Sequence, residues 1–238
     1  RLWDSIMGAL AKVAPDRIFA CCTFVDFGIC LGGTAPDGKP FVFTDFLMGS
    51  WGGRPFADGI DACTCLFMNY SNVSSEVIEQ EYPLRIEQYN FVPDTGGAGK
   101  YRGGLAMIRD YRLLADETVV QWRQDRAVFR PWGLKGGMPG TLAQGYHFSN
   151  DTKRTLKKEI FVAKKGDRLR AILPGAGSWG PPYEREVNTV LDDVRNEKVT
   201  IAAARRDYGV AIDPQTMQVD LQETNRLREA MRKAAPPG

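Results

Sequence analysis

Alternating apolar and polar positions run through the middle of the chain and predict β-strands. Residues 84–91 read L-R-I-E-Q-Y-N-F, a period of two that points alternate side chains to opposite faces of a sheet. Compact apolar or β-branched runs predict further strands at 18–24, 40–46, 105–114, 118–123, 160–163 and 168–173. The sequence Ala35-Pro36-Asp37-Gly38 has the chemistry of a turn between 18–24 and 40–46. We expect 105–114 and 118–123 to form a hairpin, and 160–173 to form a strand–turn–strand unit around residues 164–167.

Helical spacing of apolar residues is confined to three parts of the chain. Leu2, Ile6, Leu10 and Val13 predict a short amphipathic helix that packs on the residues after it. Residues 74–81 predict a helix that Ser74 or Ser75 caps, and 187–194, 201–206 and 221–231 predict helices near the end. The pattern therefore predicts an α+β fold, with a β-rich mixed lobe of antiparallel hairpins and peripheral helices at 1–183. A short helical C-terminal segment is expected at 184–238.

Glycine clusters interrupt these elements at 49–59, 94–104, 136–137 and 174–180, and the chain has 25 glycines in all. Gly99-Lys100 suggests a phosphate-binding loop, but that motif needs a glycine five residues earlier and a Ser or Thr directly after. Asp94 and Tyr101 occupy those positions. A dinucleotide-binding turn is excluded as well, since the run leads into a predicted strand and not into a helix. We interpret the clusters as turns where two backbones pass closely.

Charge and composition exclude several classes of protein. With 31 Lys and Arg against 29 Asp and Glu, the net charge is +2, without the strong basic excess of nucleic-acid-binding proteins. The only histidine, His147, cannot build a multi-histidine metal site, and we expect it to be a hydrogen-bonded surface or edge residue. No run approaches the roughly 20 apolar residues of a membrane helix, and the N-terminus does not resemble a signal peptide. A cytoplasmic protein is expected.

Two further features concern processing and redox state. The chain starts at Arg1 and has no initial Met, so we expect a fragment or a processed product. Its five cysteines, an odd number, lack the C-x₂-C spacing of zinc or thioredoxin-type motifs. We expect them to be reduced and mostly buried thiols.

Acidic residues provide the most promising candidates for chemistry. Asp58 and Asp61 lie close to Arg54 in sequence, and Glu76 and Glu79 are one helical turn apart. Carboxylates beside an arginine can position a polar substrate or act as acid and base. The alternative is a buried ion-pair network that sets the packing of the glycine-rich loop 49–59. Both interpretations remain open at the level of sequence.

Several runs, in order along nearly the whole chain, resemble the hydantoinase B/5-oxoprolinase family. The resemblance is carried by W-G-G-R-P-F-A-D-G at 51–59, E-Y-P-L-R at 81–85, P-D-T-G-G-A-G-K-Y-R-G-G at 93–104 and R-D-Y at 109–111. It continues through P-W-G-L at 131–134, the turn at 174–180 and Y-G-V at 208–210. Thr95 replaces the usual Ser, and Ala176, Ser178 and Pro181 interrupt the usual pattern near 175–182.

The resemblance implies one subunit of a two-component enzyme. A hydantoinase A-like partner would bind ATP and Mg²⁺ and phosphorylate a cyclic amide or an enolised ketone. The B-type subunit would then complete hydrolytic ring opening or, in the acetone and acetophenone carboxylase branch, carboxylation. The family has a divalent-metal site in the N-terminal half of the B-type subunit, whereas this chain resembles the C-terminal half. No residue of this chain is therefore assigned as a metal ligand.

The resemblance also implies a hetero-oligomer containing the ATP-binding subunit and the N-terminal half of the B-type subunit. We expect the isolated chain to be inactive, and a non-catalytic assembly lobe is a further alternative. No catalytic residue is identified. The candidates for a substrate-chamber wall or a subunit contact are Arg54, Asp58, Asp61, Glu76, Glu79, Asp94, Lys100 and Arg102.

Overall fold

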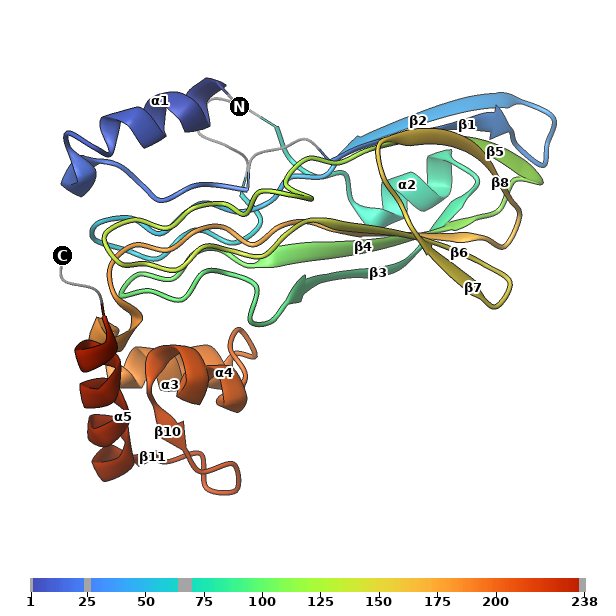
Figure 1. Ribbon diagram of the computed structural model, residues 1–238. Helices are drawn as coiled ribbons and strands as arrows, with labels where there is room; N and C mark the ends of the chain where they lie inside the picture. Colours follow the sequence, from blue (N-terminus) through green and yellow to red (C-terminus); the bar gives the residue numbers. More distant parts are fainter. Residues whose placement is uncertain (1, 24–26, 64–69, 236–238) are drawn as a thin grey trace.

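The computed structural model describes residues 2–23, 27–63 and 70–235, and Figure 1 shows their arrangement. The helices are α1 (Leu2–Leu10), α2 (Ser75–Glu81), α3 (Val187–Arg195), α4 (Ile201–Tyr208) and α5 (Leu221–Ala234), with short 3₁₀ turns at Pro15–Arg17 and Pro182–Glu184. The strands are β1 (Gly28–Thr34), β2 (Pro40–Phe46), β3 (Leu84–Val92), β4 (Ala106–Leu113), β5 (Glu117–Arg123), β6 (Gln144–Ser149), β7 (Thr152–Thr155), β8 (Glu159–Lys164), β9 (Arg168–Ile172), β10 (Ala211–Ile212) and β11 (Val219–Asp220). The α+β class is confirmed.

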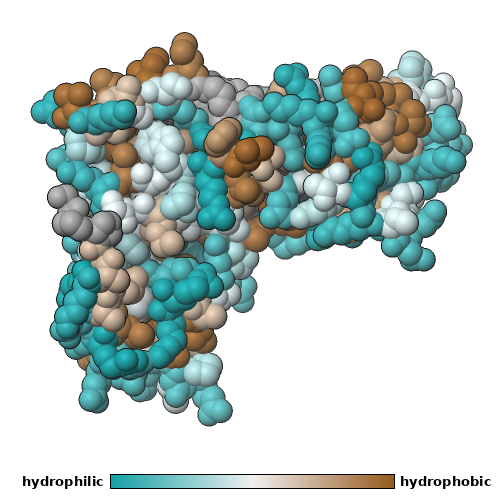
Figure 2. Space-filling model, in the orientation of Figure 1, coloured by the Kyte–Doolittle hydropathy of each residue, from teal (hydrophilic) through white to brown (hydrophobic). Residues whose placement is uncertain are grey.

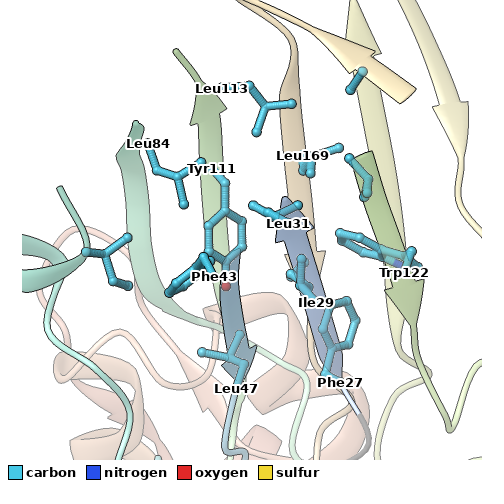
Figure 3. Close-up of a cluster of buried hydrophobic side chains, with 14 of the residues drawn as sticks. Phe27, Ile29, Leu31, Phe43, Leu47, Leu84, Tyr111, Leu113, Trp122 and Leu169 are labelled. Atoms are coloured by element: carbon cyan, nitrogen blue, oxygen red, sulfur yellow. The ribbon is translucent and has the colours of Figure 1, made fainter. Parts of the chain in front are cut away.

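Two antiparallel sheets are stacked face to face and enclose the main core. One has the order β2-β1-β5-β8 and the other β3-β4-β9-β6-β7, and they form the upper and lower layers of Figure 1. The inward side chains alternate with outward ones, as in β2, where every second residue is buried. Figure 3 shows Ile29, Leu31 and Trp122 of one sheet facing Tyr111 and Leu169 of the other.

A buried ion pair also connects the two layers. The Arg109 guanidinium donates to Asp45 Oδ2 at 2.8 Å, and the Tyr111 hydroxyl donates to the same oxygen at 2.6 Å. Both charged side chains are fully buried, and the Arg109 guanidinium stacks on the Tyr89 ring at 3.9 Å. The R-D-Y sequence therefore has a structural role, because its first and third residues hold β4 against β2.

The strands predicted at 105–114 and 118–123 are confirmed, but the prediction that they pair as a hairpin is wrong. β4 pairs with β3 and β9, whereas β5 pairs with β1 and β8. The strands β8 and β9 likewise belong to different sheets, although the turn between them forms. Each connection crosses from one layer to the other. The alternation of apolar and polar residues does not distinguish two strands in different sheets from two strands of one hairpin. In both cases each strand buries every second side chain.

The turn at Ala35–Gly38 joins a hairpin as predicted, but its first strand is β1 and not 18–24. Residues 19–23 lie outside any sheet, and Phe24 lies outside the described residues. The β1 sequence G-I-C-L-G-G-T contains three glycines, which disguise its alternation. Residues 64–69, within the apolar sequence from Ile60 to Tyr70, also lie outside the described residues.

Helix α1 forms where predicted, but its apolar stripe is not its buried side. Leu2, Ile6, Leu10 and Val13 are exposed, whereas Asp4 is buried. The packed side of the helix presents Asp4 to Arg126 and Cys21. Helix α2 begins after Ser74 as expected, although the Ser74 side chain makes no capping hydrogen bond.

Glycine-rich segments continue beyond the sheets as a bundle of extended chains, seen as parallel wavy traces in Figure 1. Gly53 N donates to Gly177 O at 2.8 Å, and Gly97 N donates to Ala176 O at 2.8 Å. A Cβ atom at Gly177 would lie 1.9 Å from the carbonyl oxygen of Trp132. We call this region, formed by 49–59, 94–104, 131–140 and 174–180, the glycine bundle. It confirms the interpretation that the clusters let backbones pass closely.

The C-terminal helices form a second apolar cluster that rests on the glycine bundle. Val190, Leu191 and Val194 of α3 pack with Ala203, Ala204 and Tyr208 of α4, and Ala98 of the glycine bundle joins them. The Thr200 side chain caps α4, Gly209 ends it in the left-handed region, and Asp220 caps α5. Within the described ranges, no helix is long and apolar enough to span a bilayer.

Candidate functional site

Asp58 and Arg102, on two loops of the glycine bundle, lie side by side and contact residues of the C-terminal segment. Asp58 accepts hydrogen bonds from Arg102 N at 2.8 Å and from both terminal nitrogens of Arg185, at 2.6 and 2.7 Å. Burial alone would raise the pKa of Asp58, but Arg185 and then Arg102 outweigh it and hold that pKa below its ordinary value. Asp58 is therefore ionised and bound on both oxygens.

Asp61 makes a second connection of the same kind. Its carboxylate accepts from Leu105 N at 2.8 Å and from Lys198 Nζ at 3.1 Å, and the Arg102 guanidinium lies 3.4 Å away. Burial would raise the pKa of Asp61, but Arg102 and these hydrogen bonds lower it. Asp61 consequently fixes the loop 49–61 both to the start of β4 and to the segment after α3.

Asp193 of α3 completes the cluster from the C-terminal side. It accepts from Arg185 Nε and Nη2 at 3.1 and 2.7 Å, and its other oxygen lies 3.6 Å from Arg102 Nε. The side chains of Arg102 and Arg185 are each only 2 % exposed. Burial would lower the pKa of Arg185, but Asp58 and Asp193 raise it above the ordinary value.

Three carboxylates and three cations thus balance one another in what we call the charged network: Asp58, Asp61, Asp193, Arg102, Arg185 and Lys198. Its carboxylates all have charged partners, and the lowered pKa values of Asp58 and Asp61 leave these two ionised and not poised to take a proton at neutral pH. This geometry corresponds to the second interpretation of the acidic residues, a buried ion-pair network. It packs the glycine-rich loop and also attaches the C-terminal segment.

The remaining candidates divide between this junction and other places. Arg54 folds back within its own loop and donates to Asp58 O at 3.0 and 2.7 Å. Asp94 accepts from Thr200 N and Oγ1, each at 2.7 Å, and so supports the start of α4. Lys100 Nζ lies 3.5 Å from Glu184, beside a polar pocket of about 330 Å³ that Asp58 and Arg185 also line.

Glu76 and Glu79 do not join the charged network. Glu76 is exposed on α2, and Glu79 Oε1 accepts from Ile86 N at 2.7 Å. Among the contacts of the described residues, none connects either glutamate to Arg54, Asp58 or Asp61. Their hypothetical partnership with Arg54 therefore has no support in the geometry.

A second, mainly apolar pocket of about 230 Å³ lies beneath α1. Trp3, Met7, Phe19 and Trp132 are among its lining residues, together with Asp4 and Cys21. Arg126 ion-pairs with Asp4, and its Nη2 lies 2.9 Å from Cys21 Sγ. Burial and then Asp4 raise the pKa of the Cys21 thiol far above its ordinary value, so this cysteine is a neutral thiol and a poor nucleophile.

The other cysteines are placed as follows. Cys22 is buried, Cys30 and Cys63 are half-buried, and none of the four described cysteines forms a disulfide with another of them. Cys65 lies outside the described residues. The expectation of reduced thiols agrees with the four that can be seen, although only two of them are fully buried.

His147 is hydrogen-bonded through both ring nitrogens, as expected, but it is buried in β6, an inner strand, and is neither a surface nor an edge residue. Nε2 lies 2.8 Å from Asp167 Oδ2, and Arg154 Nε donates to Nδ1 at 3.3 Å. Because arginine can only donate, Nδ1 accepts and Nε2 carries the proton. Within the described ranges, no three His, Cys, Asp or Glu side chains gather as metal ligands. This part of the chain does not fit a divalent-metal site.

Sequence reasoning missed Arg185, Asp193 and Lys198 as members of the network, and Asp4 and Arg126 beneath α1. Arg185 is 127 residues from Asp58 in the chain, and no local motif in the sequence marks Arg185. Arg126 has a positive φ of 59°, which its sequence does not indicate. An ion pair between residues as far apart in sequence as Asp58 and Arg185 can be recognised only once the fold is known.

Comparisons with known proteins agree with this fold. The sequence profile of the hydantoinase B/oxoprolinase family matches residues 1–182. An uncharacterised protein of Methanocaldococcus jannaschii is 37 % identical over 231 residues, covering 96 % of this chain and 40 % of that protein. A Pseudomonas protein described provisionally as the B component of a D-/L-hydantoinase is 31 % identical over 230 residues, covering 95 % of this chain and 38 % of that one.

One similar solved structure is that of the ATP-dependent caprolactamase from Pseudomonas jessenii. Its TM-score is 0.84 at 27 % sequence identity, covering 93 % of this chain and 40 % of that chain. This chain therefore spans about two-fifths of the length of the proteins that it matches.

Proposed function

Because the chain belongs to the hydantoinase B/oxoprolinase family, we propose that it forms the C-terminal part of a B-type subunit that opens a cyclic amide in an ATP-dependent reaction. The observation that carries this proposal is the likeness to the caprolactamase, with a TM-score of 0.84 over 93 % of the chain. The name of that enzyme states both ATP dependence and a lactam substrate. The D-/L-hydantoinase component among the relatives also acts, by its name, on a cyclic amide.

The proposed partner is a hydantoinase A-like subunit that binds ATP with Mg²⁺ and phosphorylates the amide oxygen. An amide carbonyl is a weak electrophile, and phosphorylation of its oxygen makes the carbon far more reactive toward water. Water adds to that carbon, and the ring C–N bond breaks as the nitrogen takes up a proton, which leaves an acyl phosphate. A second water then hydrolyses the acyl phosphate to the carboxylic acid and free phosphate. Water must reach the activated ring only after phosphorylation, so a closed chamber between subunits suits this chemistry.

Within that assembly, we assign this chain the role of a shaped wall and not of an acid–base catalyst. Its conspicuous carboxylates, Asp58, Asp61 and Asp193, are held by cations. Arg54, Lys100 and Arg102 lie on the same glycine-rich loops, and we propose these loops as chamber wall or subunit contact. We propose that the divalent metal implied by the resemblance is held outside the part of this chain that the structure describes.

The experiment that tests the proposed function measures ADP release by the full-length B-type subunit in complex with its ATP-binding partner. We expect lactams or hydantoins to stimulate ADP release in the absence of bicarbonate, with ring-opened product formed in parallel. Stimulation that requires both a ketone and bicarbonate would instead identify a carboxylase. Ring opening by the ATP-binding partner alone would identify this chain as an assembly lobe.

The variant Arg54→Ala tests the proposed loop within the same complex. The Arg54 guanidinium holds the carbonyl of Asp58, so its loss should let the loop 49–59 shift while the fold persists. We expect kcat/KM for ring opening to fall about tenfold, since small displacements of positioning groups have large effects on rate. Wild-type turnover by a properly assembled Arg54→Ala complex would remove Arg54 from the chamber.

A further inference from the structure

The outer face of the five-stranded sheet carries a row of basic side chains in strict register. Arg85 of β3 lies opposite Arg112 of β4, which lies opposite Arg168 of β9. The row continues through Phe148 of β6 to Lys153 of β7. Since residues in register share one face of a sheet, four cations from four strands are aligned across it.

A fifth cation, Arg170, lies two residues from Arg168 on the same strand and therefore on the same face. Like charges so close together on a sheet repel one another, so the arrangement needs either compensation within the chain or a partner. We call these five residues the basic face: Arg85, Arg112, Lys153, Arg168 and Arg170.

Compensation within the described part of the chain is only partial. Asp110, almost fully buried, accepts from Arg168 at 2.5 Å and from Arg170 at 2.7 Å. Glu87 holds Arg112 through two hydrogen bonds, of 2.8 and 3.0 Å, and lies 4.0 Å from Arg168. Two carboxylates therefore pair with three of the five cations, Arg112, Arg168 and Arg170, whereas the whole chain carries a net charge of only +2. A surplus of positive charge is concentrated on this one face.

Aromatic rings hold some of the cations in place. Lys153 Nζ lies 3.9 Å from the centre of the Tyr146 ring, and the Arg168 guanidinium lies 4.0 Å from the Phe148 ring. These cation–π contacts occupy a face of each ring, where a nucleotide base would otherwise stack. Guanidinium groups form paired hydrogen bonds with carboxylates, and Arg112 and Arg170 already bind Glu87 and Asp110 in this way. The chemistry favours an acidic protein surface over a nucleic acid.

The shape of the molecule leaves an open angle in which such a partner can bind. The C-terminal helices project below the glycine bundle, on the same side as the lower, five-stranded sheet (Figure 1). The space-filling outline is L-shaped, and the arm that contains the sheets is mainly hydrophilic along the border of the inner angle (Figure 2). The basic face belongs to the lower layer that borders this angle.

We propose that the basic face docks an acidic surface of the ATP-binding partner subunit. This inference rests on the proposed function for the identity of the partner, whereas the charge of the docking surface follows from the five basic side chains themselves. Arg112, Arg168 and Arg170 have carboxylate or aromatic neighbours that orient them. Arg85 and Lys153, exposed on β3 and β7 at the two edges of the sheet, would reach furthest around the partner.

The test is the affinity between the full-length subunit and the purified hydantoinase A-like subunit, measured without ATP or lactam. The variant Arg85→Glu/Lys153→Glu reverses both exposed edge cations. The control Lys12→Glu/Lys164→Glu makes the same change in charge elsewhere, at a site after α1 and on the outer face of the other sheet. Far-UV circular dichroism and thermal unfolding check the fold, and Arg85→Gln/Lys153→Gln replaces the reversal if that variant does not fold.

We expect the reversal to raise the Kd at least about tenfold and the control to leave it within about twofold. The wild-type Kd should also rise between about 0.02 and 0.15 M salt, and this dependence should be weaker in the reversal variant. Equal affinity of wild type and reversal, or equal weakening by the control, would overturn the proposal. So would binding of a labelled single-stranded oligonucleotide that the reversal abolishes while partner binding persists.

These outcomes are separable from the proposed function. A complex that binds through the basic face but opens no cyclic amide would contradict the proposed reaction and leave the docking surface intact. A complex that opens a lactam normally with the reversed edge cations, and with unchanged affinity, would contradict the docking surface alone.

Discussion

Asp193 lies between two buried arginines and shows what a single residue contributes to the charged network. Its two oxygens face Arg185 and Arg102, side chains that are expensive to bury without a counter-charge. Asp192, its neighbour on α3, is 65 % exposed and faces Arg195 at 3.6 Å. The two adjacent aspartates thus both face arginines, but only Asp193 does so in a buried environment.

This contrast predicts unequal effects of the same substitution. Asp193→Asn should lower the free energy of unfolding by about 3 kcal/mol, because it leaves buried positive charge without full compensation. Asp192→Asn should change it by less than about 0.5 kcal/mol, as an exposed pair contributes little. Urea unfolding of both variants measures the difference. Equal effects of the two substitutions would show that the network does not stabilise the fold.

The aspartates of the network also predict a pH dependence. Asp58 and Asp61 have pKa values below the ordinary aspartate value in the folded chain, so folding favours their ionised forms. Their contribution to stability is complete above the unfolded pKa of about 4 and is lost as the pH falls through their lower folded values. Urea unfolding between neutral and acidic pH should show this loss, and Asp58→Asn/Asp61→Asn should flatten it. An equally steep loss in that variant would assign the dependence to other groups.

Among the elements, the glycine bundle depends on the absence of side chains. A Cβ at Gly177 would lie 1.9 Å from the oxygen of Trp132, and one at Gly175 would lie 1.8 Å from the oxygen of Thr95. Both obstacles are backbone atoms, which cannot rotate away as a side chain can. Gly32 in β1 differs, since the nearest atom to its Cβ position is 3.6 Å away.

Alanine at these glycines should therefore have different effects. Gly177→Ala should destabilise the chain by about 3 kcal/mol or more, or prevent folding, because the backbones must separate. Gly32→Ala should be neutral or slightly stabilising, since alanine restricts the unfolded chain and fits the strand. Thermal unfolding and soluble yield compare the two. A Gly177→Ala chain as stable as wild type would contradict the close packing of the bundle.

The elements also show how far the sequence could predict this structure. Strands such as β3 and β5 and helices such as α3 follow from their own periodicity, because the pattern is local. Strand pairing is decided by the packing of the core between the two sheets and not by the local sequence. The connections β4–β5 and β8–β9 cross from one sheet to the other, but in sequence they resemble hairpins. Of the charged network, Asp58, Asp61 and Arg102 were found beside glycines. Arg185 is an ordinary arginine in sequence, and only its distant partners reveal its role.

At the scale of the whole molecule, two apolar clusters meet through the glycine bundle and the charged network. The main cluster lies between the sheets, and the second connects α3 and α4 to Ala98. The division into 1–183 and 184–238 stays a prediction. The charged network would make the two parts move together, which suits a wall that must keep its shape while a partner delivers an activated substrate.

A full-length subunit containing this chain should, above all, use ATP to open a cyclic amide. The ratio of ADP to ring-opened product, measured in the complex with the ATP-binding partner, tests this most directly. We predict about one ADP per ring opened, with neither product formed when ATP or the cyclic amide is omitted. Ring opening at an unchanged rate without ATP, or ADP formed only with ketone and bicarbonate, would contradict it.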